Sequence, residues 1–481
     1  MTVNSFLSSI QACIELPFLC TVYPMREPQS LFLTEDSLGI VTDLYQLTMA
    51  AGYFEHGMQD TATFELFVRQ LPENRSYLIT AGIEQAIHYL THIKFSEDNI
   101  QFLRQLPAFK HVSYEFFKYL KNFTFSGTVY AMPEGTIAFS EEPLIRVTAP
   151  IIEAQLVETY LLSIINFQTL IATKSSRIVY AAKGREVIDF GTRRAHGPQA
   201  GILAARSSFI GGCSSTSNVF AAYTLGIPAA GTIAHSWVMA FENELDSFHK
   251  FYETFPDYTV LLIDTYDTLA GAQHAAMISN KIKGVRIDSG DVVKLSKEVR
   301  KILDAKGLQH VKIIASGDLH ENRIDDLLKN NAPIDSFGVG TEMVTSKDAP
   351  ALGGVYKLVE QEHKGKIIPK MKLSKGKVTY PGKKQVYRIT DTVGNFVKDV
   401  IGLEGENIEE IPLLIPVIKD GKRCYNLPTI HEIQRTASEN LTHLPNPFKH
   451  LTDAETYPVY KSHGLEVKKQ EAEKIVRNMN M

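Results

Sequence analysis

GVRIDSGD at residues 284–291, VKIIASGD at 311–318 and DSFGVGTEM at 335–343 share one pattern. In each stretch a short apolar run ends in a polar cluster that contains glycine, and a helical pattern follows. Similar apolar runs with polar ends lie earlier in the chain, in REVIDFGTRR (185–194), GIPAAGTIAHS (226–236) and TVLLIDTYDT (259–268). Strand, polar cluster and helix in repeated alternation predict parallel βα units.

These units predict an α/β fold with a β/α barrel that need not be complete, and an open doubly wound sheet is the alternative. Both architectures place the polar clusters at the C-terminal ends of the strands, so their side chains are expected to converge. Apolar spacing predicts amphipathic helices over 268–282 and 291–307 and a long helical region over 151–181. Alternation over 61–70 predicts a strand.

Composition shifts along the chain predict four parts. We expect a peripheral extension over residues 1–35 and an N-terminal α/β domain over 36–150. The barrel is expected over 151–358 and a C-terminal module over 359–481, and the alternative is that the strand-like segments of this module continue the N-terminal domain.

Charge and cysteine content exclude several classes of protein. The 481 residues carry a net charge of -4, whereas a general nucleic-acid binder would show a strong basic excess. The four cysteines, Cys13, Cys20, Cys213 and Cys424, have no paired spacing, which favours a reducing, cytoplasmic location. Residues 6–25 are fairly apolar, but they lack the basic flank of a signal peptide, and prolines interrupt them. No membrane association is therefore expected.

Two glycine-bearing loops are candidates for phosphate binding. ASGD places Gly317 after one apolar strand, and GVGT places Gly338, Gly340 and Thr341 at the end of another. Glycine lets backbone N–H groups approach an anion closely. The alternative is that these glycines serve only as turn residues.

Charged residues at other strand ends suit substrate or metal binding. Alternation places Arg286 and Asp288 on one face of a strand, where the arginine could hold an anion and the aspartate sugar hydroxyls or Mg²⁺. A structural ion pair is the alternative. Of the adjacent Arg193 and Arg194, we expect Arg193 to enter the site.

A histidine and two aspartates complete the candidate set. His235, beside Ser236, ends a strand of the series, and a neutral imidazole is a competent nucleophile toward phosphorus. Asp264 is a candidate partner for that imidazole, whereas Asp267 is better explained as the N-cap of the following helix.

Taken together, these motifs resemble the nicotinate phosphoribosyltransferase family. The resemblance covers about 37–360, and PKMKLSKGKVTYPGKKQV at 369–386 extends it. Besides the strand ends, it rests on TDLYQLTMAAGYF (42–54), YAMPEGTIAF (130–139), ATKSSRI (172–178) and DFGTRRAHGPQAG (189–201).

The resemblance implies a split N-terminal α/β domain packed with an irregular β/α barrel. It also implies an enzyme that forms nicotinate mononucleotide and pyrophosphate from nicotinate and phosphoribosyl pyrophosphate in NAD salvage, with Mg²⁺ and with ATP as co-substrate. His235 matches a phosphorylated histidine, Phe190 an aromatic that stacks on pyridine, and Tyr45 an aromatic from a second subunit. A homodimer with shared sites is therefore expected. The matches for the other positions are arginines near the phosphoribosyl group and the pyridine substituent (Arg193, Arg286), a ribose or metal contact (Asp288) and the 5′-phosphate cradle (Gly317, Gly338, Gly340, Thr341).

Three alternatives remain open at the level of sequence. Nicotinamide phosphoribosyltransferase would share the barrel and the histidine, but TRRAHGPQAG at 192–201 looks more like the acid-specific family. Quinolinate phosphoribosyltransferase works without ATP and has shorter chains. A non-catalytic sugar-phosphate-binding barrel predicts damage at His235, Asp264 or Asp288, and all three are present.

Overall fold

The computed structural model describes residues 31–374 and 378–479. Residues 1–30 of the expected extension and residues 375–377 of the 369–386 motif lie outside the described residues. The chain divides between Thr34 and Glu35, and the fold below concerns the part from Glu35 onward. No helix in the described ranges is both long and apolar enough to cross a membrane.

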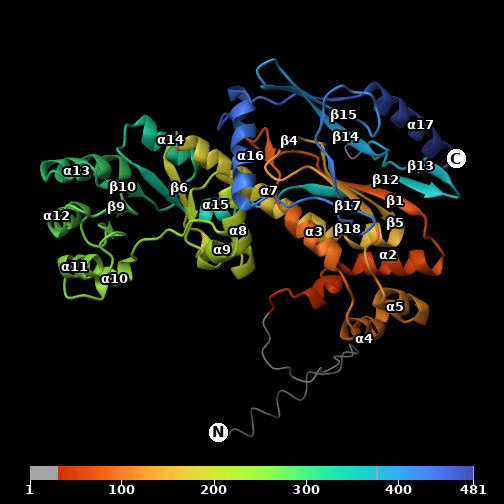
Figure 1. The fold of residues 1–481 in the computed structure, drawn as a ribbon, viewed down its shortest axis with the longest axis horizontal. Helices are drawn as coiled ribbons and strands as arrows, with labels where there is room; N and C mark the ends of the chain where they lie inside the picture. Colours follow the sequence, from red (N-terminus) through yellow and green to blue (C-terminus); the bar gives the residue numbers. More distant parts are fainter. Residues whose placement is uncertain (1–30, 375–377, 480–481) are drawn as a thin grey trace, which may run out of the picture. The chain divides into compact units, whose positions relative to one another are not determined.

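A six-stranded parallel sheet forms the barrel-like part of the fold (Figure 1). Its strands pair in parallel and its edges are β7 and β8, so the sheet curls into a half-barrel that does not close. The expected α/β fold with an irregular, incomplete barrel is confirmed. In spatial order the strands are β7 (Ser215–Thr216), β6 (Glu186–Asp189), β11 (Ser336–Val339), β10 (Lys312–Ala315), β9 (Gly284–Ile287) and β8 (Val260–Leu262).

Helices follow these strands in turn, as the alternation predicted. In α13 the residues Val292, Ser296, Val299 and Leu303 are buried, which matches the helical repeat of one inward face. The helices of this region are α8 (Pro198–Ile210), α9 (Val219–Leu225), α10 (His235–Met239), α11 (Glu244–Thr254), α12 (Thr268–Ile278), α13 (Val292–Ala305), α14 (Glu321–Lys329) and α15 (Thr341–Val344).

One apolar run of the series does not form a strand of the sheet. In GIPAAGTIAHS the pairing is limited to an isolated bridge between Ala229 and Thr216, and His235 begins helix α10. Pro228 within this run has no backbone N–H to donate, which disfavours a regular ladder.

A seven-stranded sheet combines strands from both ends of the chain. β1 pairs antiparallel with both β12 and β5, and β3 pairs with β17. The C-terminal strands β12, β13, β17 and β18 thus complete the N-terminal sheet. Its order is β13 (Lys366–Pro369), β12 (Gly354–His363), β1 (Thr61–Val68), β5 (Pro143–Pro150), β3 (Thr128–Ala131), β17 (Ile415–Lys419) and β18 (Lys422–Arg423).

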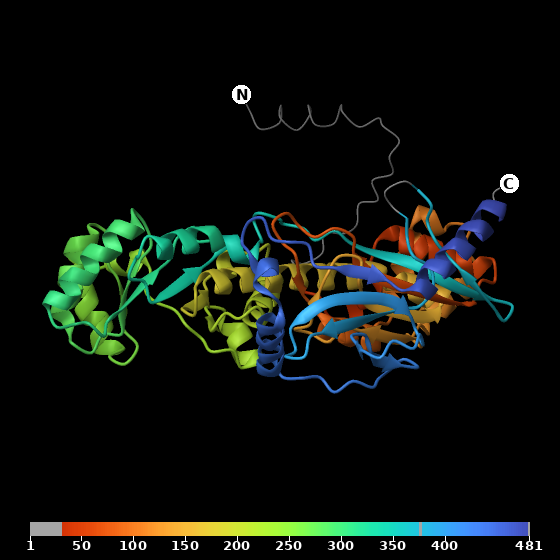
Figure 2. The same cartoon turned by 90° about the horizontal axis from the view of Figure 1, so that it is seen from above.

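Helices and two smaller sheets accompany this large sheet. Helix α17 packs beside β15, and Figure 2 shows the dark-blue helix next to the blue strands. One smaller sheet has four strands, in the order β16 (Ile411–Pro412), β14 (Lys384–Thr390), β15 (Phe396–Leu403) and β19 (Val459–Lys461). The other pairs β2 (Leu78–Ile79) with β4 (Ile137–Ala138). The remaining helices are α2 (Leu44–Glu55), α3 (Ile83–His92), α4 (Glu97–Gln105), α5 (Tyr114–Lys121), α6 (Ile151–Leu156), α7 (Glu158–Ala181), α16 (Ile430–His443) and α17 (His463–Met479).

Candidate functional site

A cavity of about 260 Å³ lies at the C-terminal ends of β6, β9, β10 and β11. This is the edge at which parallel βα units place their loops, as the sequence predicted. The predicted residues that line it are Phe190, Arg193, Arg286, Asp288, Gly317, Gly338, Gly340 and Thr341. The structure adds Arg194, Ser316, Asp318, Leu319 and Glu342.

The sequence held a usable signal for some of the added residues. Ser316 and Asp318 flank Gly317 in ASGD, so the same strand-end argument covers them. Arg194 was set aside in favour of Arg193, but both line the cavity. Leu319 and Glu342 carry no pattern that would have marked them.

Phe190 is presented by a turn that a buried carboxylate holds. Asp189 Oδ2 accepts a hydrogen bond from Thr216 Oγ1 at 2.7 Å, and Oδ1 accepts one from the Gly191 N–H at 2.8 Å. Burial raises the pKa of Asp189, although these two hydrogen bonds oppose that shift. The Phe190 N–H donates to the Val339 carbonyl at 2.8 Å, which joins the ends of β6 and β11.

Arg286 places a guanidinium near the Phe190 ring. Its Cζ lies 5.9 Å from the ring centroid, and the side chain is buried. Nη1 donates to Asp288 Oδ1 at 3.1 Å and to Ser316 Oγ at 3.2 Å, while Nη2 donates to the Ile233 carbonyl at 2.9 Å. Burial lowers the pKa of Arg286, but from so high an ordinary value that the group stays cationic. An aromatic face beside a fixed cation suits a flat, anionic ring compound.

The two glycine loops pack directly against other residues of the cavity. Gly317 has φ of +82°, and a Cβ there would overlap the carbonyl oxygen of Asp288. A Cβ at Gly338 would overlap the Phe190 ring. Both positions therefore require glycine, and the loops bring bare backbone to the cavity, where N–H groups can bind an anion.

His235 lies beside Asp288 rather than beside Asp264. Its Nε2 is 4.0 Å from Asp288 Oδ2, and its Nδ1 is 3.1 Å from Thr265 Oγ1. The hydroxyl of Thr265, and not the carboxylate of the neighbouring Asp264, therefore contacts the His235 imidazole. Asp264 instead accepts from the Asp288 N–H at 2.9 Å and from Ser289 Oγ at 2.7 Å. Asp264 thus fixes the loop that carries Asp288.

Some predicted residues lie outside the lining of this cavity. His235, Ser236, Asp264 and Tyr45 are not among the described residues that line the cavity. Tyr45 is on α2 and is 48% exposed, in a separate part of the fold from the parallel sheet. Asp267 caps α12 by accepting from the Ala270 N–H at 2.8 Å, as the alternative interpretation of that residue predicted.

The carboxylates of the site match the donors that Mg²⁺ prefers. In the described ranges, no three His, Cys, Asp or Glu side chains come together in a way that would hold a metal ion. Mg²⁺ commonly binds through one or two carboxylates together with substrate phosphates and water. Asp264 Oδ1 is buried without a hydrogen-bond partner in the described part of the chain, and Asp288 lies next to it. The residues present therefore fit a magnesium ion that arrives with a phosphorylated substrate.

Comparison with family models identifies three matching segments. The nicotinate phosphoribosyltransferase (NAPRTase) N-terminal domain matches residues 40–166, the nicotinate phosphoribosyltransferase (NAPRTase) family model matches 186–400, and the nicotinate phosphoribosyltransferase C-terminal domain matches 406–469.

Curated proteins and solved structures give the same result. A nicotinate phosphoribosyltransferase of Mycobacterium tuberculosis is 44% identical over 428 residues, which span 87% of this chain and 90% of the relative. The Bacillus subtilis nicotinate phosphoribosyltransferase is 40% identical over 459 residues, with 88% and 93% of the two chains covered. The crystal structure of human nicotinic acid phosphoribosyltransferase aligns with a TM-score of 0.79 at 28% identity, covering 89% of this chain and 99% of the human chain.

Proposed function

The chain belongs to the nicotinate phosphoribosyltransferase family, and from that premise we propose that it converts nicotinate and phosphoribosyl pyrophosphate into nicotinate mononucleotide and pyrophosphate in NAD salvage. The observation that carries the proposal is the shared cavity of Phe190, Arg286 and the two glycine loops. An aromatic face, a buried cation and bare backbone there match a pyridine ring, its carboxylate and a phosphate.

Each part of the substrates has a complementary group. Phe190 stacks on the pyridine ring, and Arg193 or Arg286 binds its carboxylate through a charge-assisted hydrogen bond. Such a bond selects the acid over the neutral amide. The backbone at Gly317, Gly338, Gly340 and Thr341 binds the 5′-phosphate. Asp288 binds the ribose hydroxyls from the end of β9.

The transfer develops positive charge at the anomeric carbon and negative charge on the leaving pyrophosphate. The nicotinate ring nitrogen forms the new bond to that carbon while the bond to the pyrophosphate oxygen breaks, and no proton has to be removed from the nucleophile. Arginines at the cavity neutralise the leaving group. When bound through Asp288 and Asp264, Mg²⁺ supplies further neutralisation of pyrophosphate.

ATP coupling through His235 is part of the proposal. Thr265 Oγ1 holds one side of the imidazole, and the His235 side chain is 41% exposed, so it is accessible to a nucleotide. The γ-phosphoryl group passes from ATP to the imidazole, ADP leaves, and water later hydrolyses the phosphohistidine. The added negative charge beside Asp288 changes the electrostatics of the site between the two halves of the cycle.

A homodimer with shared active sites also belongs to the proposal. Helix α2 exposes Leu44, Tyr45 and Met49, and α9 exposes Val219, Phe220 and Tyr223. Apolar side chains exposed together on a helix are typical of subunit interfaces. Tyr45 would reach the pyridine ring of the neighbouring subunit.

The absence of paired cysteine spacing in the sequence supports a cytoplasmic reaction.

A product assay tests the function. Purified protein with phosphoribosyl pyrophosphate and Mg²⁺ is given nicotinate or nicotinamide, with and without ATP. We expect nicotinate mononucleotide, faster with ATP, and His235→Ala should reduce the rate to one that ATP no longer affects. Turnover of nicotinamide instead would assign the chain to amide chemistry. No turnover of either compound, despite binding of phosphoribosyl pyrophosphate, would indicate a non-catalytic barrel.

A further inference from the structure

Lys174, from the ATKSSRI motif, is buried in the middle of helix α7 and holds two carboxylates at once. Its Nζ lies 2.6 Å from Glu321 Oε2 and 2.8 Å from Asp348 Oδ1. The lysine is 1% exposed, and Glu321 is 3% exposed. The functional site described above does not use Lys174, which is not among the residues that line the cavity.

The two carboxylates belong to the two phosphate loops. Glu321 is the first residue of α14 and follows the 316–320 loop that contains Gly317. Asp348 follows α15, which begins at Thr341 directly after Gly340. One ammonium group is therefore tied to the far end of both segments that form the proposed 5′-phosphate cradle.

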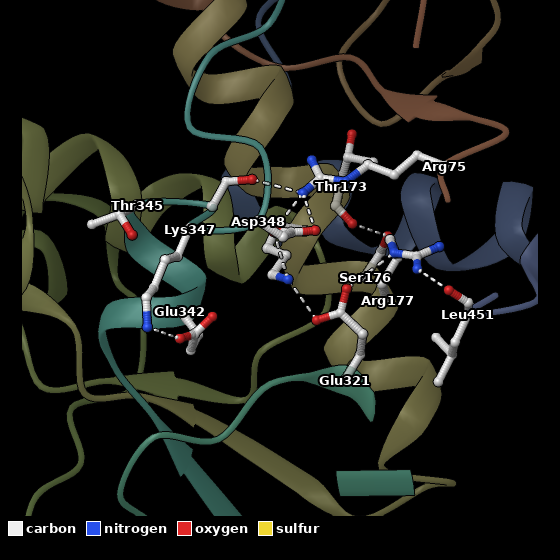
Figure 3. Close-up of polar contacts among 12 residues, drawn as sticks. Arg75, Thr173, Ser176, Arg177, Glu321, Glu342, Thr345, Lys347, Asp348 and Leu451 are labelled. Carbon is white, nitrogen blue, oxygen red and sulfur yellow. Dashed lines mark hydrogen bonds and ion pairs between the residues drawn. The ribbon is translucent and has the colours of Figure 1, made fainter. Parts of the chain in front are cut away.

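Arg177 and Arg75 each bind one of these carboxylates, Glu321 and Asp348 respectively (Figure 3). Arg177 Nε donates to Glu321 Oε1 at 3.2 Å, and its Nη2 donates to the Leu451 carbonyl at 2.8 Å. Arg75 Nη2 donates to Ser346 Oγ at 2.7 Å and to Asp348 Oδ1 at 2.9 Å. The cluster joins α7, the β1–β2 connection and both loops.

The positive charges of Lys174 and the two arginines keep both carboxylates ionised. Burial alone would raise the pKa of Glu321 and of Asp348, but the neighbouring Lys174 and arginines outweigh it and hold both below their usual range, Asp348 at about 2. Removing one member of such a buried pair leaves an uncompensated charge, so the surrounding backbone has to move or admit water.

Backbone strain in the same loops shows that they need external support. Asp318 and Ser346 adopt φ of +45° and +43°, a region that residues with a side chain rarely occupy. Asp318 lines the cavity, and Ser346 is held by Arg75. Strained conformations of this kind persist only where surrounding contacts enforce them.

We propose that Lys174 is a positioning residue that sets the spacing between the 316–320 and 338–348 loops, and thereby the fit of the site to a 5′-phosphate monoester. This inference rests on the proposed function, in which those loops bind the phosphoribosyl phosphate. Phe190 and Arg286 touch these loops, but they are also held outside them, by the Asp189 turn and by the Ile233 carbonyl. The pyridine part of the site should therefore depend less on Lys174 than the phosphate cradle does.

The test compares Lys174→Met with Arg388→Met. Arg388 is also a buried cation, paired with Asp399 in the four-stranded sheet away from both loops. Ribose 5-phosphate is titrated by calorimetry, and KM is measured for each substrate. For Lys174→Met we expect the Kd of ribose 5-phosphate and the KM of phosphoribosyl pyrophosphate to rise roughly tenfold or more, with the KM of nicotinate changed by less than about threefold. Arg388→Met should lower the Tm without this selective effect.

Asp348→Asn provides a second variant if Lys174→Met does not fold. Asp348 is partly exposed, and asparagine keeps its size and one acceptor. We expect the same selective rise in the Kd of ribose 5-phosphate, smaller than for Lys174→Met. Equal changes for both substrates, or the same pattern in Arg388→Met, would overturn the proposal. The titration needs no turnover, so an inactive wild-type protein would defeat the proposed function while the positioning of the loops could still be measured.

Discussion

At the scale of single residues, the walls of the cavity depend on positions that have no side chain. Gly338 faces the Phe190 ring so closely that a Cβ would overlap two ring atoms. The ring is held in turn by the hydrogen bonds of Asp189 and by the Phe190 N–H. Glycine at this position thus determines where the aromatic face lies.

We predict that Gly338→Ala displaces the Phe190 ring and weakens nicotinate binding. The KM of nicotinate should rise by roughly tenfold, because small misplacements of a binding group are costly. Steady-state kinetics with each substrate varied in turn would measure this. Gly353→Ala is the matched control, since a Cβ at Gly353 would meet nothing within 4 Å and its KM should stay that of wild type. An unchanged KM in Gly338→Ala would show that the ring does not contact the substrate.

At the scale of helices, Asp267 has a structural role, whereas the nearby Asp264 belongs to the candidate site. It lies in the same DTYDT cluster as Asp264, but its side chain accepts from the Ala270 N–H as the N-cap of α12. A cap satisfies a backbone donor that the first turn leaves free.

Asp267→Ala should therefore lower stability and leave chemistry intact. We expect a loss of about 1 kcal/mol in the free energy of unfolding, measured by urea denaturation. The kcat should stay within about twofold of wild type. Asp264→Ala is the comparison, since it removes the acceptor for the Asp288 N–H and should reduce kcat/KM strongly. A large loss of kcat in Asp267→Ala would assign that carboxylate to the reaction.

The packing of the strands around β14 and β15 buries a second pair of carboxylates. Glu142 is fully buried, and burial followed by the nearby charge of Asp399 raises its pKa well above the usual range. Arg388 Nη2 donates a hydrogen bond to Asp399 at 2.5 Å, so the charge of Arg388 mainly neutralises Asp399 and not Glu142. Among the described atoms, Glu142 Oε1 has no hydrogen-bond partner in its charged form.

This arrangement predicts a stability that falls with rising pH. A carboxyl whose pKa is raised in the folded state binds its proton more tightly there than in the unfolded chain. Its contribution is complete below the unfolded pKa of about 4.3 and is lost as the pH rises through the folded value. Glu142→Gln mimics the protonated form and should flatten the dependence, which urea unfolding between pH 5 and 9 would show. Parallel curves for the two proteins would contradict this.

At the scale of the whole molecule, the proposed dimer makes a prediction about mixed subunits. If Tyr45 completes the site of its neighbour, a Tyr45→Ala subunit and an Arg286→Ala subunit can together form one intact site. Random mixing in coexpression makes half of the dimers hybrid, so activity should recover to about a quarter of wild type. Each variant alone should be nearly inactive. No recovery, with hybrid dimers confirmed by differential tags, would place Tyr45 outside the partner's site.

The sequence by itself determined the class of fold and the edge of the sheet where the chemistry gathers. Alternating apolar runs and polar clusters depend only on local periodicity, and the carboxyl ends of parallel strands meet at one edge. The motifs around Phe190, Arg286, Gly317 and Gly338 therefore predicted neighbours in space. The N-cap role of Asp267 was also readable, since capping is local.

The tertiary structure alone decided which side chains touch. Thr265 rather than Asp264 contacts His235, the GIPAAG run makes one bridge instead of a strand, and C-terminal strands complete the N-terminal sheet. In the sequence, Lys174 is an ordinary lysine of a helical stretch. Only the tertiary structure pairs it with Glu321, 147 residues away, and with the still more distant Asp348. Such choices depend on distances of a few ångströms between distant segments, and these are set by the packing of all the elements together.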